Sequence, residues 1–299
     1  MYSAYYGFKE KPFNVTSDPA FLYLSRKHKE AIASMSYGIQ QRKGIIVLTG
    51  EIGTGKTTLC RTLLGQLDKS VKTALVLNPC FSEIQLLEFI IQDFGIQAKK
   101  KNRLSLINEL NKFLIEESLA GNNAAIIIDE AQNLTARQLE QIRLLSNLET
   151  SKEKLLQIIL TGQPELREKL KSHQLRQLRQ RVMVDYHIEP LDRSEIKEYV
   201  RHRLDIASGR SLPGIRGEQF NIDAQERKAP EFSEDAISEI FQFSNGTPRL
   251  LNLLCDRALL LGFIKETRAI CANIIRECVK DIKTDEHNLR GIKENAGKP

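Results

Sequence analysis

The sequence is poor in several residue types that define whole classes of protein. It has no tryptophan, and only five of its 299 residues are cysteine. An odd number of cysteines without a Cys-x-x-Cys pair argues against a disulfide framework and against a zinc site. We expect buried thiols in a reducing compartment. The cysteines are Cys60, Cys80, Cys255, Cys271 and Cys278.

Long hydrophobic runs are also missing. The longest apolar runs are no longer than a strand, so no transmembrane helix is expected. Residues 1–6 lack the basic and apolar regions of a signal peptide, and we expect a cytoplasmic protein. The composition is ordinary for a globular protein, with 41% hydrophobic and 27% charged residues. A net charge of +6 permits binding to nucleic acid or acidic lipid without requiring it.

A glycine-rich motif at residues 50–58 is the strongest feature of the sequence. It follows the apolar run 45–49, which is typical of a buried strand, and leucines at helical spacing come after it. This order matches a phosphate-binding loop between a strand and a helix. The alternative is a strand-to-helix turn that holds a lysine by chance. The candidate nucleotide-binding residues are Gly50, Glu51, Ile52, Gly53, Thr54, Gly55, Lys56, Thr57 and Thr58.

These residue types suit a nucleoside triphosphate. Glycines allow backbone N–H groups to turn inward, and the positive end of the following helix adds to the field at the phosphates. We expect Lys56 to reach the β- and γ-phosphates and the Thr57 hydroxyl to ligate Mg²⁺.

Strand-like and helix-like segments alternate over the first two thirds of the chain. Because helix-length stretches separate the strands, we expect β-α-β crossovers and a doubly wound, parallel, five-stranded α/β sheet. Ser82 with Gln85, and Thr135 with Gln138, are capping-box pairs that predict helix starts. Besides 45–49, the expected strands are 73–78, 124–130, 156–161 and 182–188.

From residue 192 onward the pattern predicts only helices, at 192–208, 233–244, 248–263 and 270–282. A polar stretch at 209–231 is expected to form a loop. We therefore expect an α/β core at 1–190, which includes an N-terminal segment and helix at 1–44. A helical domain at 191–283 and a frayed tail at 284–299 complete the chain.

An acidic pair, Asp129-Glu130, follows the apolar segment 124–128. An aspartate at the end of a strand beside a phosphate loop can hold Mg²⁺, so Asp129 and Thr57 are the candidate metal ligands. Glu130 can orient and deprotonate a water molecule. Such pairs also occur by chance, but the position of this one after an apolar strand favours hydrolysis.

Further along, Thr161-Gly162-Gln163 closes a strand expected near the phosphate loop. We expect a polar side chain there to face the γ-phosphate, with Gln163 as the first candidate and Thr161 as the second. The simpler alternative is a turn ahead of the helix that begins near Pro164.

Arginines occur at two places that suit contact with a nucleotide. Arg179 and Arg181 precede the last strand, where one of them can reach the γ-phosphate of a neighbouring subunit as an arginine finger. The alternatives are a solvated helix face or a nucleic-acid patch. Arg249 follows Thr247 and Pro248 in the first turn of a helix and can fold back on the nucleotide. The alternative there is a capped helix with a surface arginine.

Taken together, these features resemble an AAA+ ATPase, with a P-loop NTPase core and a C-terminal helical lid. More specifically, residues 1–282 resemble the ExeA/GspA-type ATPases of bacterial secretion and MSHA-type pilus assembly. The resemblance implies that the N-terminal aromatic segment packs near the adenine. Members of this family often continue into a transmembrane helix and a peptidoglycan-binding domain, and the present sequence resembles the shorter members or the ATPase module alone. The similar phrases are Tyr5–Phe8, Lys11–Phe13, Asp18-Pro19, Phe21–Ser25, His28, Thr161–Leu166 and Pro248–Leu259.

The resemblance implies a Mg²⁺-dependent ATPase that forms a hexamer or a similar ring. Hydrolysis would drive assembly of a secretion or pilus complex, and a partner could bring the protein to the inner membrane. A second hypothesis is an ATP-gated DNA-binding regulator similar to the TniB/TnsC transposition ATPases, motivated by the basic charge and by residues 99–103. A third is a nucleotide switch that turns over ATP only with a partner.

Overall fold

The computed structural model describes residues 1–14, 16, 18–98, 100–210 and 229–296, with side chains up to residue 284. The chain divides into two compact units. One unit is Leu24–Glu189, and the other combines Met1–Tyr23 with Pro190–Pro299.

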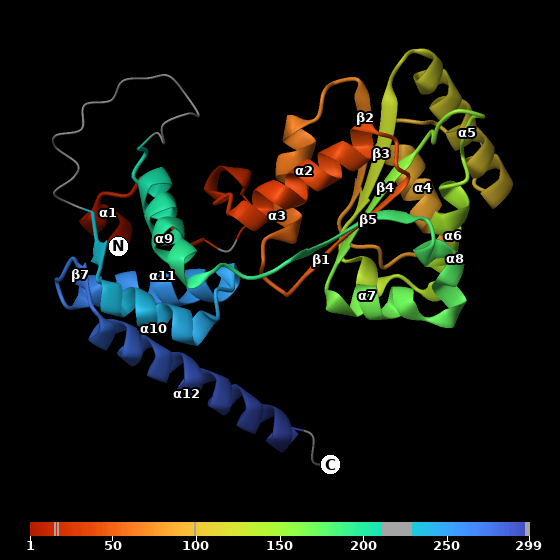
Figure 1. Ribbon diagram of the computed structural model, residues 1–299. Helices are drawn as coiled ribbons and strands as arrows, with labels where there is room; N and C mark the ends of the chain where they lie inside the picture. Colours follow the sequence, from red (N-terminus) through yellow and green to blue (C-terminus); the bar gives the residue numbers. More distant parts are fainter. Residues whose placement is uncertain (15, 17, 99, 211–228, 297–299) are drawn as a thin grey trace. The chain divides into compact units, whose positions relative to one another are not determined.

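The Leu24–Glu189 unit is built on a parallel five-stranded sheet (Figure 1). The strand order is β2-β3-β4-β1-β5, so β1 lies between β4 and β5. This confirms the expected α/β class and number of strands. The strands are β1 (Ile45–Gly50), β2 (Val71–Val76), β3 (Asn123–Ile128), β4 (Gln157–Gly162) and β5 (Val182–Ile188).

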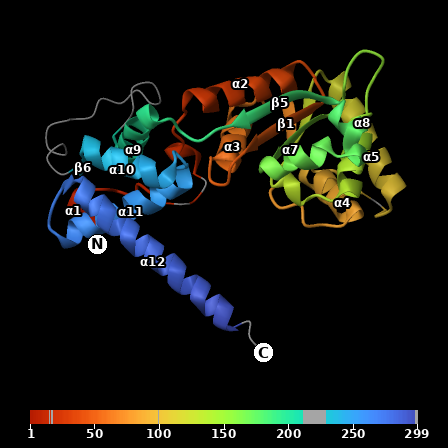
Figure 2. The same ribbon diagram turned by 60° about the horizontal axis from the view of Figure 1, so that its bottom comes forward.

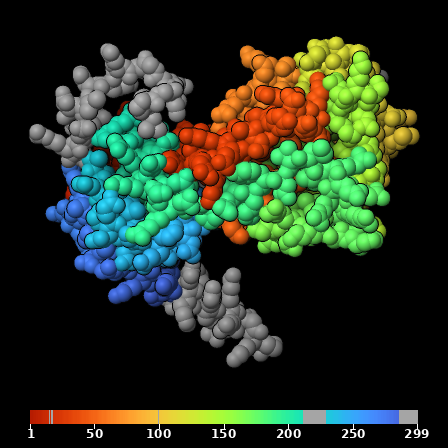
Figure 3. All heavy atoms as spheres, in the orientation of Figure 1, coloured from red at the N-terminus to blue at the C-terminus, as the bar shows by residue number. Residues whose placement is uncertain are grey.

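Helices cover both faces of this sheet (Figure 2). Successive side chains of a strand point to opposite faces, so Ile45 and Val47 face one layer of helices while Ile46 and Leu48 face the other. A side chain at Gly38 of α2 would clash with Ile46, which shows how closely α2 approaches the sheet. Figure 3 shows α2 beside β5 at the surface of this unit. The helices are α2 (Arg26–Gln40), α3 (Lys56–Gln66), α4 (Glu83–Asp93), α5 (Arg103–Leu119), α6 (Ala136–Leu145), α7 (Pro164–Lys171) and α8 (Arg176–Arg179).

Two of the helix starts follow from local chemistry. Ser82 and Gln85 form the expected capping box at α4, with each side chain bonding the backbone of the other residue. Thr135 and Gln138 do the same at α6. These reciprocal bonds satisfy N–H groups that have no partner within the helix, which confirms both predicted boundaries.

The second unit is mainly helical, with one addition and one extension relative to our expectation. Residues 231–232 and 269–270 form a short parallel strand pair that a purely helical pattern did not predict. The last helix runs to Ala296, so most of the expected tail from 284 continues as helix. The expected loop at 209–231 falls largely outside the described residues. The elements are α1 (Tyr2–Tyr6), α9 (Arg193–Ala207), β6 (Glu231–Phe232), α10 (Glu234–Ser244), α11 (Pro248–Ile264), β7 (Ala269–Ile270) and α12 (Ala272–Ala296).

The N-terminal segment belongs to this helical unit, although we expected residues 1–44 to be part of the α/β core. The Tyr6 hydroxyl donates to the carbonyl oxygens of Leu259 at 3.2 Å and Thr267 at 3.1 Å. The Tyr2 hydroxyl donates to the Asp256 carboxylate. Aromatic rings at positions 2–21 thus fill the core formed with α9, α10 and α11, and only α2 of the expected N-terminal region covers the sheet.

Arg203 of α9 connects the N-terminal segment to the helices. Its guanidinium group donates to the carbonyl oxygens of Pro12 at 2.6 Å and Asn14 at 3.0 Å, and to the Tyr199 hydroxyl at 3.2 Å. It also lies 5.0 Å from the centre of the Phe21 ring. A cation that is only 6% exposed is therefore satisfied by backbone oxygens and π-electrons.

The cysteines differ in part from our expectation of buried thiols. Cys60, Cys255 and Cys278 are buried, whereas Cys80 and Cys271 are exposed. All five are free. Within the described residues, no helix combines the length and the apolar character needed to cross a membrane.

We predict that Arg203→Met lowers the free energy of unfolding by about 3 kcal/mol, because it leaves the buried carbonyl group of Pro12 and the partly buried one of Asn14 without their charged donor. Urea denaturation measures the change. Arg201→Met is the matched control on the same helix, because the Arg201 side chain is 84% exposed. Equal stability of the two variants would show that Arg203 does not hold the N-terminal segment.

Candidate functional site

The glycine-rich motif forms a loop between a buried strand and a helix. β1 ends at Gly50, and α3 begins at Lys56. Gly55 has a φ of 92°, a left-handed conformation that a side chain would disfavour. A Cβ atom at Gly50 would lie 2.7 Å from the carbonyl oxygen of Ile188 in β5. The loop therefore packs closely against the sheet at Gly50, and the left-handed conformation of Gly55 turns the chain into α3.

The Lys56 side chain lies inside this loop. Its ammonium group donates to the carbonyl oxygens of Gly50 and Glu51 at 2.8 Å each. Burial lowers the pKa of Lys56, and the nearby carboxylates of Glu130 and Asp129 oppose that shift. Among the described residues, no carboxylate forms an ion pair with this ammonium group. A bound phosphate would supply the missing negative charge, so the loop fits a triphosphate.

The other motif residues surround this position. Thr54 is buried, and its hydroxyl donates to the carbonyl oxygen of Glu51 at 2.9 Å, which tightens the loop. Glu51 and Ile52 are exposed, and Gly53 has a φ of 82°. Thr58 lies in the first turn of α3, half-buried.

His28 supports the loop from α2, a role that the sequence motif did not reveal. Its ring Nε2 lies 3.0 Å from the carbonyl oxygen of Thr54, and its Nδ1 lies 2.6 Å from the Ser25 hydroxyl oxygen. A carbonyl oxygen can only accept, so Nε2 carries the hydrogen and Nδ1 accepts from Ser25. His28 is 3% exposed, so its ring is locked beneath the loop.

Asp129 and Thr57 are brought together as the sequence predicted. The Thr57 hydroxyl donates to Asp129 Oδ2 at 2.5 Å. The Thr161 hydroxyl donates to Oδ1 of the same carboxylate at 2.6 Å. One hydroxyl and one carboxylate are the oxygen ligands that Mg²⁺ takes alongside water and phosphate, so this pair fits Mg²⁺. Within the described residues, no cluster of three or more His, Cys, Asp or Glu side chains could hold a metal.

Glu130 stands next to this pair in an unusual backbone conformation. Its φ of 52° is in the left-handed region, which costs a residue with a side chain free energy. The Gln163 side-chain amide donates to Glu130 Oε2 at 3.3 Å. Gln163, the first candidate to face the γ-phosphate, thus contacts Glu130, while Thr161, the second candidate, contacts Asp129. The four polar residues predicted from separate strand ends lie in one group.

Two further side chains in this group were not predicted. The Gln132 amide donates to Glu130 Oε2 at 2.5 Å, and the Lys169 ammonium group donates to the Gln132 carbonyl oxygen at 2.5 Å. Gln132 lies only two residues after Glu130, but sequence spacing does not show that the 3₁₀ turn Ala131–Asn133 folds its side chain back onto Glu130.

Burial raises the pKa of the Cys60 thiol, which lies near the site, to about 12, and this makes the thiol unreactive.

Arg179 and Arg181 lie at the N-terminal ends of the strands, whereas the phosphate loop lies at the C-terminal ends. Arg181 precedes the first residue of β5, whereas the phosphate loop follows the last residue of β1, which is parallel to β5. A strand of the length of β5 separates these two ends of the sheet by about 20 Å. Neither arginine can therefore reach the phosphate loop of its own chain.

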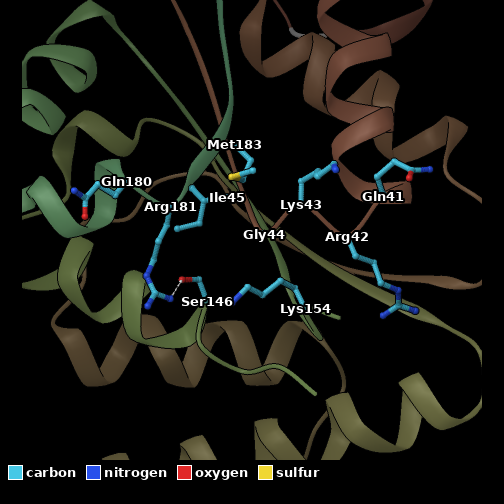
Figure 4. Close-up of a pocket in the computed structure, with 10 residues that line it drawn as sticks. All are labelled: Gln41, Arg42, Lys43, Gly44, Ile45, Ser146, Lys154, Gln180, Arg181 and Met183. Carbon is cyan, nitrogen blue, oxygen red and sulfur yellow. Dashed lines mark hydrogen bonds between the residues drawn. The ribbon is translucent and has the colours of Figure 1, made fainter. Parts of the chain in front are cut away.

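The two arginines differ in their surroundings. Arg181 donates to the side chains of Asn147 and Ser146, and it lines a pocket of about 470 Å³ (Figure 4). In this view Lys154 extends toward Ser146 from the opposite side. The Arg179 side chain is exposed and forms no hydrogen bond or ion pair with any described residue.

Arg249 belongs to the helical unit. It lies exposed in the first turn of α11, after Pro248 as predicted. Thr247 occupies the N-cap position, but its side chain makes no capping bond, in contrast to our expectation. The preceding Asn245 and Gly246 both have positive φ values, which turn the chain sharply between α10 and α11.

We predict that His28→Ala weakens nucleotide binding about fivefold, because the loop loses the buried bond to Thr54. Titration with a fluorescent triphosphate analogue measures the dissociation constant. His173→Ala is the control, since His173 is exposed. Unchanged affinity in a folded His28→Ala protein would contradict a supporting role for the ring.

Comparison with known proteins agrees with this geometry. The model of a family described as "AAA domain" matches residues 39–170. General secretion pathway protein A from Aeromonas hydrophila is 38% identical over 295 residues, which is 98% of this chain. The chain spans about half the length of that relative, since the alignment covers 49% of it.

Solved structures share the fold. The ORC2 protein of Aeropyrum pernix, in ADPNP–ADP complexes, has a TM-score of 0.61 and 15% identity over 92% of this chain and 72% of its own. Cdc6p from Pyrobaculum aerophilum has a TM-score of 0.60 and 16% identity over 88% and 70%. Residues 39–170, which include the phosphate loop and the acidic pair, thus match an AAA domain, and the chain is similar over 98% of its length to general secretion pathway protein A.

Proposed function

We propose that this chain binds ATP with Mg²⁺ at the loop 50–57 and hydrolyses it to ADP and phosphate. The position of Glu130 carries this proposal. Its carboxylate accepts hydrogen bonds from the side chains of Gln132 and Gln163. Its backbone N–H donates to Asp129, which also accepts from the Thr57 hydroxyl of the phosphate loop. A site that only bound nucleotide would need no more than Lys56 and the loop. A fixed carboxylate next to them is what the activation of a water molecule requires.

The chain's own groups have distinct roles in this reaction. Loop N–H groups and Lys56 bind the phosphates and stabilise the charge that develops on the γ-phosphoryl group. Thr57 and Asp129 hold Mg²⁺, which neutralises charge on the phosphate oxygens. Glu130 accepts a proton as the water oxygen attacks phosphorus and the bond to the leaving ADP oxygen breaks. Gln163 orients Glu130 or the water.

We predict that Glu130→Gln lowers ATP turnover by about 100-fold or more, because an amide cannot accept the proton. ATP affinity stays within about twofold of wild type, since the phosphate loop is intact. Phosphate release and nucleotide titration measure the two quantities.

Lys56→Ala is the comparison variant, which should lose both affinity and turnover. If Glu130→Gln hydrolysed ATP at the wild-type rate, Glu130 would not be the base.

We also propose that the active form is a ring in which one subunit completes the site of the next. This proposal is supported by the place of Arg179, about 20 Å from its own phosphate loop along the strands. Arg179 is the better candidate for the finger, because it is exposed and without a described partner, whereas Asn147 and Ser146 hold Arg181 within its own subunit. Arg249, at the start of α11, is proposed as the contact from the helical lid.

Mixing two inactive variants tests action between subunits. We predict that Arg179→Ala lowers turnover about 10³-fold, as expected for an arginine finger, without weakening ATP binding. Adding Lys56→Ala subunits, which keep Arg179, restores turnover, because an intact phosphate loop then meets an intact arginine.

If the active form is a ring, ATP turnover per subunit is also expected to rise with protein concentration, and light scattering measures the assembly of the subunits. Arg176→Ala is a control on the same short helix, since Arg176 is exposed as well. No recovery in a mixture that co-assembles would exclude Arg179 as a finger in trans.

The biological role that we propose follows from homology to general secretion pathway protein A. We infer that hydrolysis drives assembly of a secretion or pilus complex, with a protein partner that can bring the ATPase to the inner membrane. Co-purification of the Glu130→Gln variant, with ATP bound, from cells tests for this partner. Recovery of DNA in place of a membrane-complex protein would favour the DNA-binding regulator.

A further inference from the structure

Gln132 lies beside the acidic pair with both ends of its side chain hydrogen-bonded, and neither the motif nor the comparisons assign it a role. Both ends of its amide are used. Its Nε2 donates to Glu130 Oε2 at 2.5 Å, and its Oε1 accepts from the backbone N–H of Gln163 at 3.1 Å. One side chain therefore connects the Glu130 carboxylate, two residues after β3, to Gln163, the residue that follows β4.

The surroundings of Gln132 are shaped to hold it. A Cβ atom at Gly162 would lie 2.7 Å from Gln132 Oε1, so the backbone of β4 leaves space for this amide only because position 162 is glycine. Lys169 of α7 donates to the carbonyl oxygens of Gln132 at 2.5 Å and Leu134 at 2.8 Å, which fixes the turn that carries the side chain. A glutamine that merely filled a surface turn would need neither feature.

The direction of the bonds to Glu130 is informative. Gln132 and Gln163 both donate to the same oxygen, Oε2. No hydrogen bond to Oε1 of Glu130 comes from any part of the chain that the structure describes. Two donors on one oxygen orient the carboxylate and leave the other oxygen able to accept a proton.

We propose that Gln132 is a positioning residue for hydrolysis, which holds the Glu130 carboxylate so that Oε1 faces the attacking water. This inference rests on the proposed role of Glu130 as the base. Gln132 itself acts through Glu130, and through the Gln163 backbone, without contacting the phosphates. Its constraint also keeps Glu130 in the left-handed backbone conformation, which the residue would otherwise tend to leave.

The test replaces Gln132 in the full chain and separates turnover from binding. We expect Gln132→Leu to lower kcat about tenfold or more, because a base that is misplaced by about 1 Å loses most of its effect. KM, the dissociation constant of ATP and the melting temperature stay at wild-type values. Gln132→Asn, which keeps the amide but is one methylene shorter, loses kcat in the same way.

Gln92→Leu is the matched control, since Gln92 is an exposed glutamine on α4 and should leave all four quantities unchanged. Wild-type or raised kcat in Gln132→Leu would overturn the inference, as would a parallel loss of kcat, ATP binding and melting temperature. Glu130→Gln in the same assay separates the two claims. If Glu130→Gln is inactive and Gln132→Leu is fully active, only the positioning role fails, whereas an active Glu130→Gln removes the proposed function itself.

Discussion

The ammonium group of Lys56 is buried at the end of β1, and it forms no ion pair in the described part of the chain. Two loop carbonyl oxygens hold it, and two carboxylates lie near enough to offset part of the cost of burial. This arrangement requires several other features. Gly50 must let the loop pass close to β5, and α3 must begin at Lys56 so that its N–H groups and its positive end face the same space as the ammonium group.

The acidic side of the site depends on the same strand ends. Asp129 and Glu130 follow β3, which pairs with β4, and β4 pairs with β1. Parallel pairing brings the carboxyl ends of these three strands to one edge, where Thr57, Thr161 and Gln163 meet the two carboxylates. The bonds among them orient each group before a substrate arrives, which is how a preorganised site stabilises charge without rearrangement.

The helical unit shows that neighbours in sequence need not be neighbours in a domain. The first 23 residues pack with α9, α10 and α11, while the next 20 include α2, which covers the sheet. Arg203 is the clearest reason why the N-terminal segment packs with the helical unit, since its guanidinium group donates to the carbonyl oxygens of Pro12 and Asn14. The chain therefore crosses between the two units at Tyr23–Leu24 and again at Glu189–Pro190.

The sequence by itself determined the five strands of the main sheet, the phosphate loop, the capping boxes at α4 and α6 and the acidic pair, because each depends on residues within a few positions of one another. Apolar periodicity, glycine conformations and capping bonds are local, so they are legible in a linear pattern. Tertiary structure alone decided the rest. It placed His28 beneath Thr54, folded Gln132 back onto Glu130, and joined residues 1–23 to the C-terminal helices. It also separated Arg179 from its own phosphate loop by the length of β5. These contacts depend on which side chains the folded chain brings together, and no spacing along the sequence encodes that.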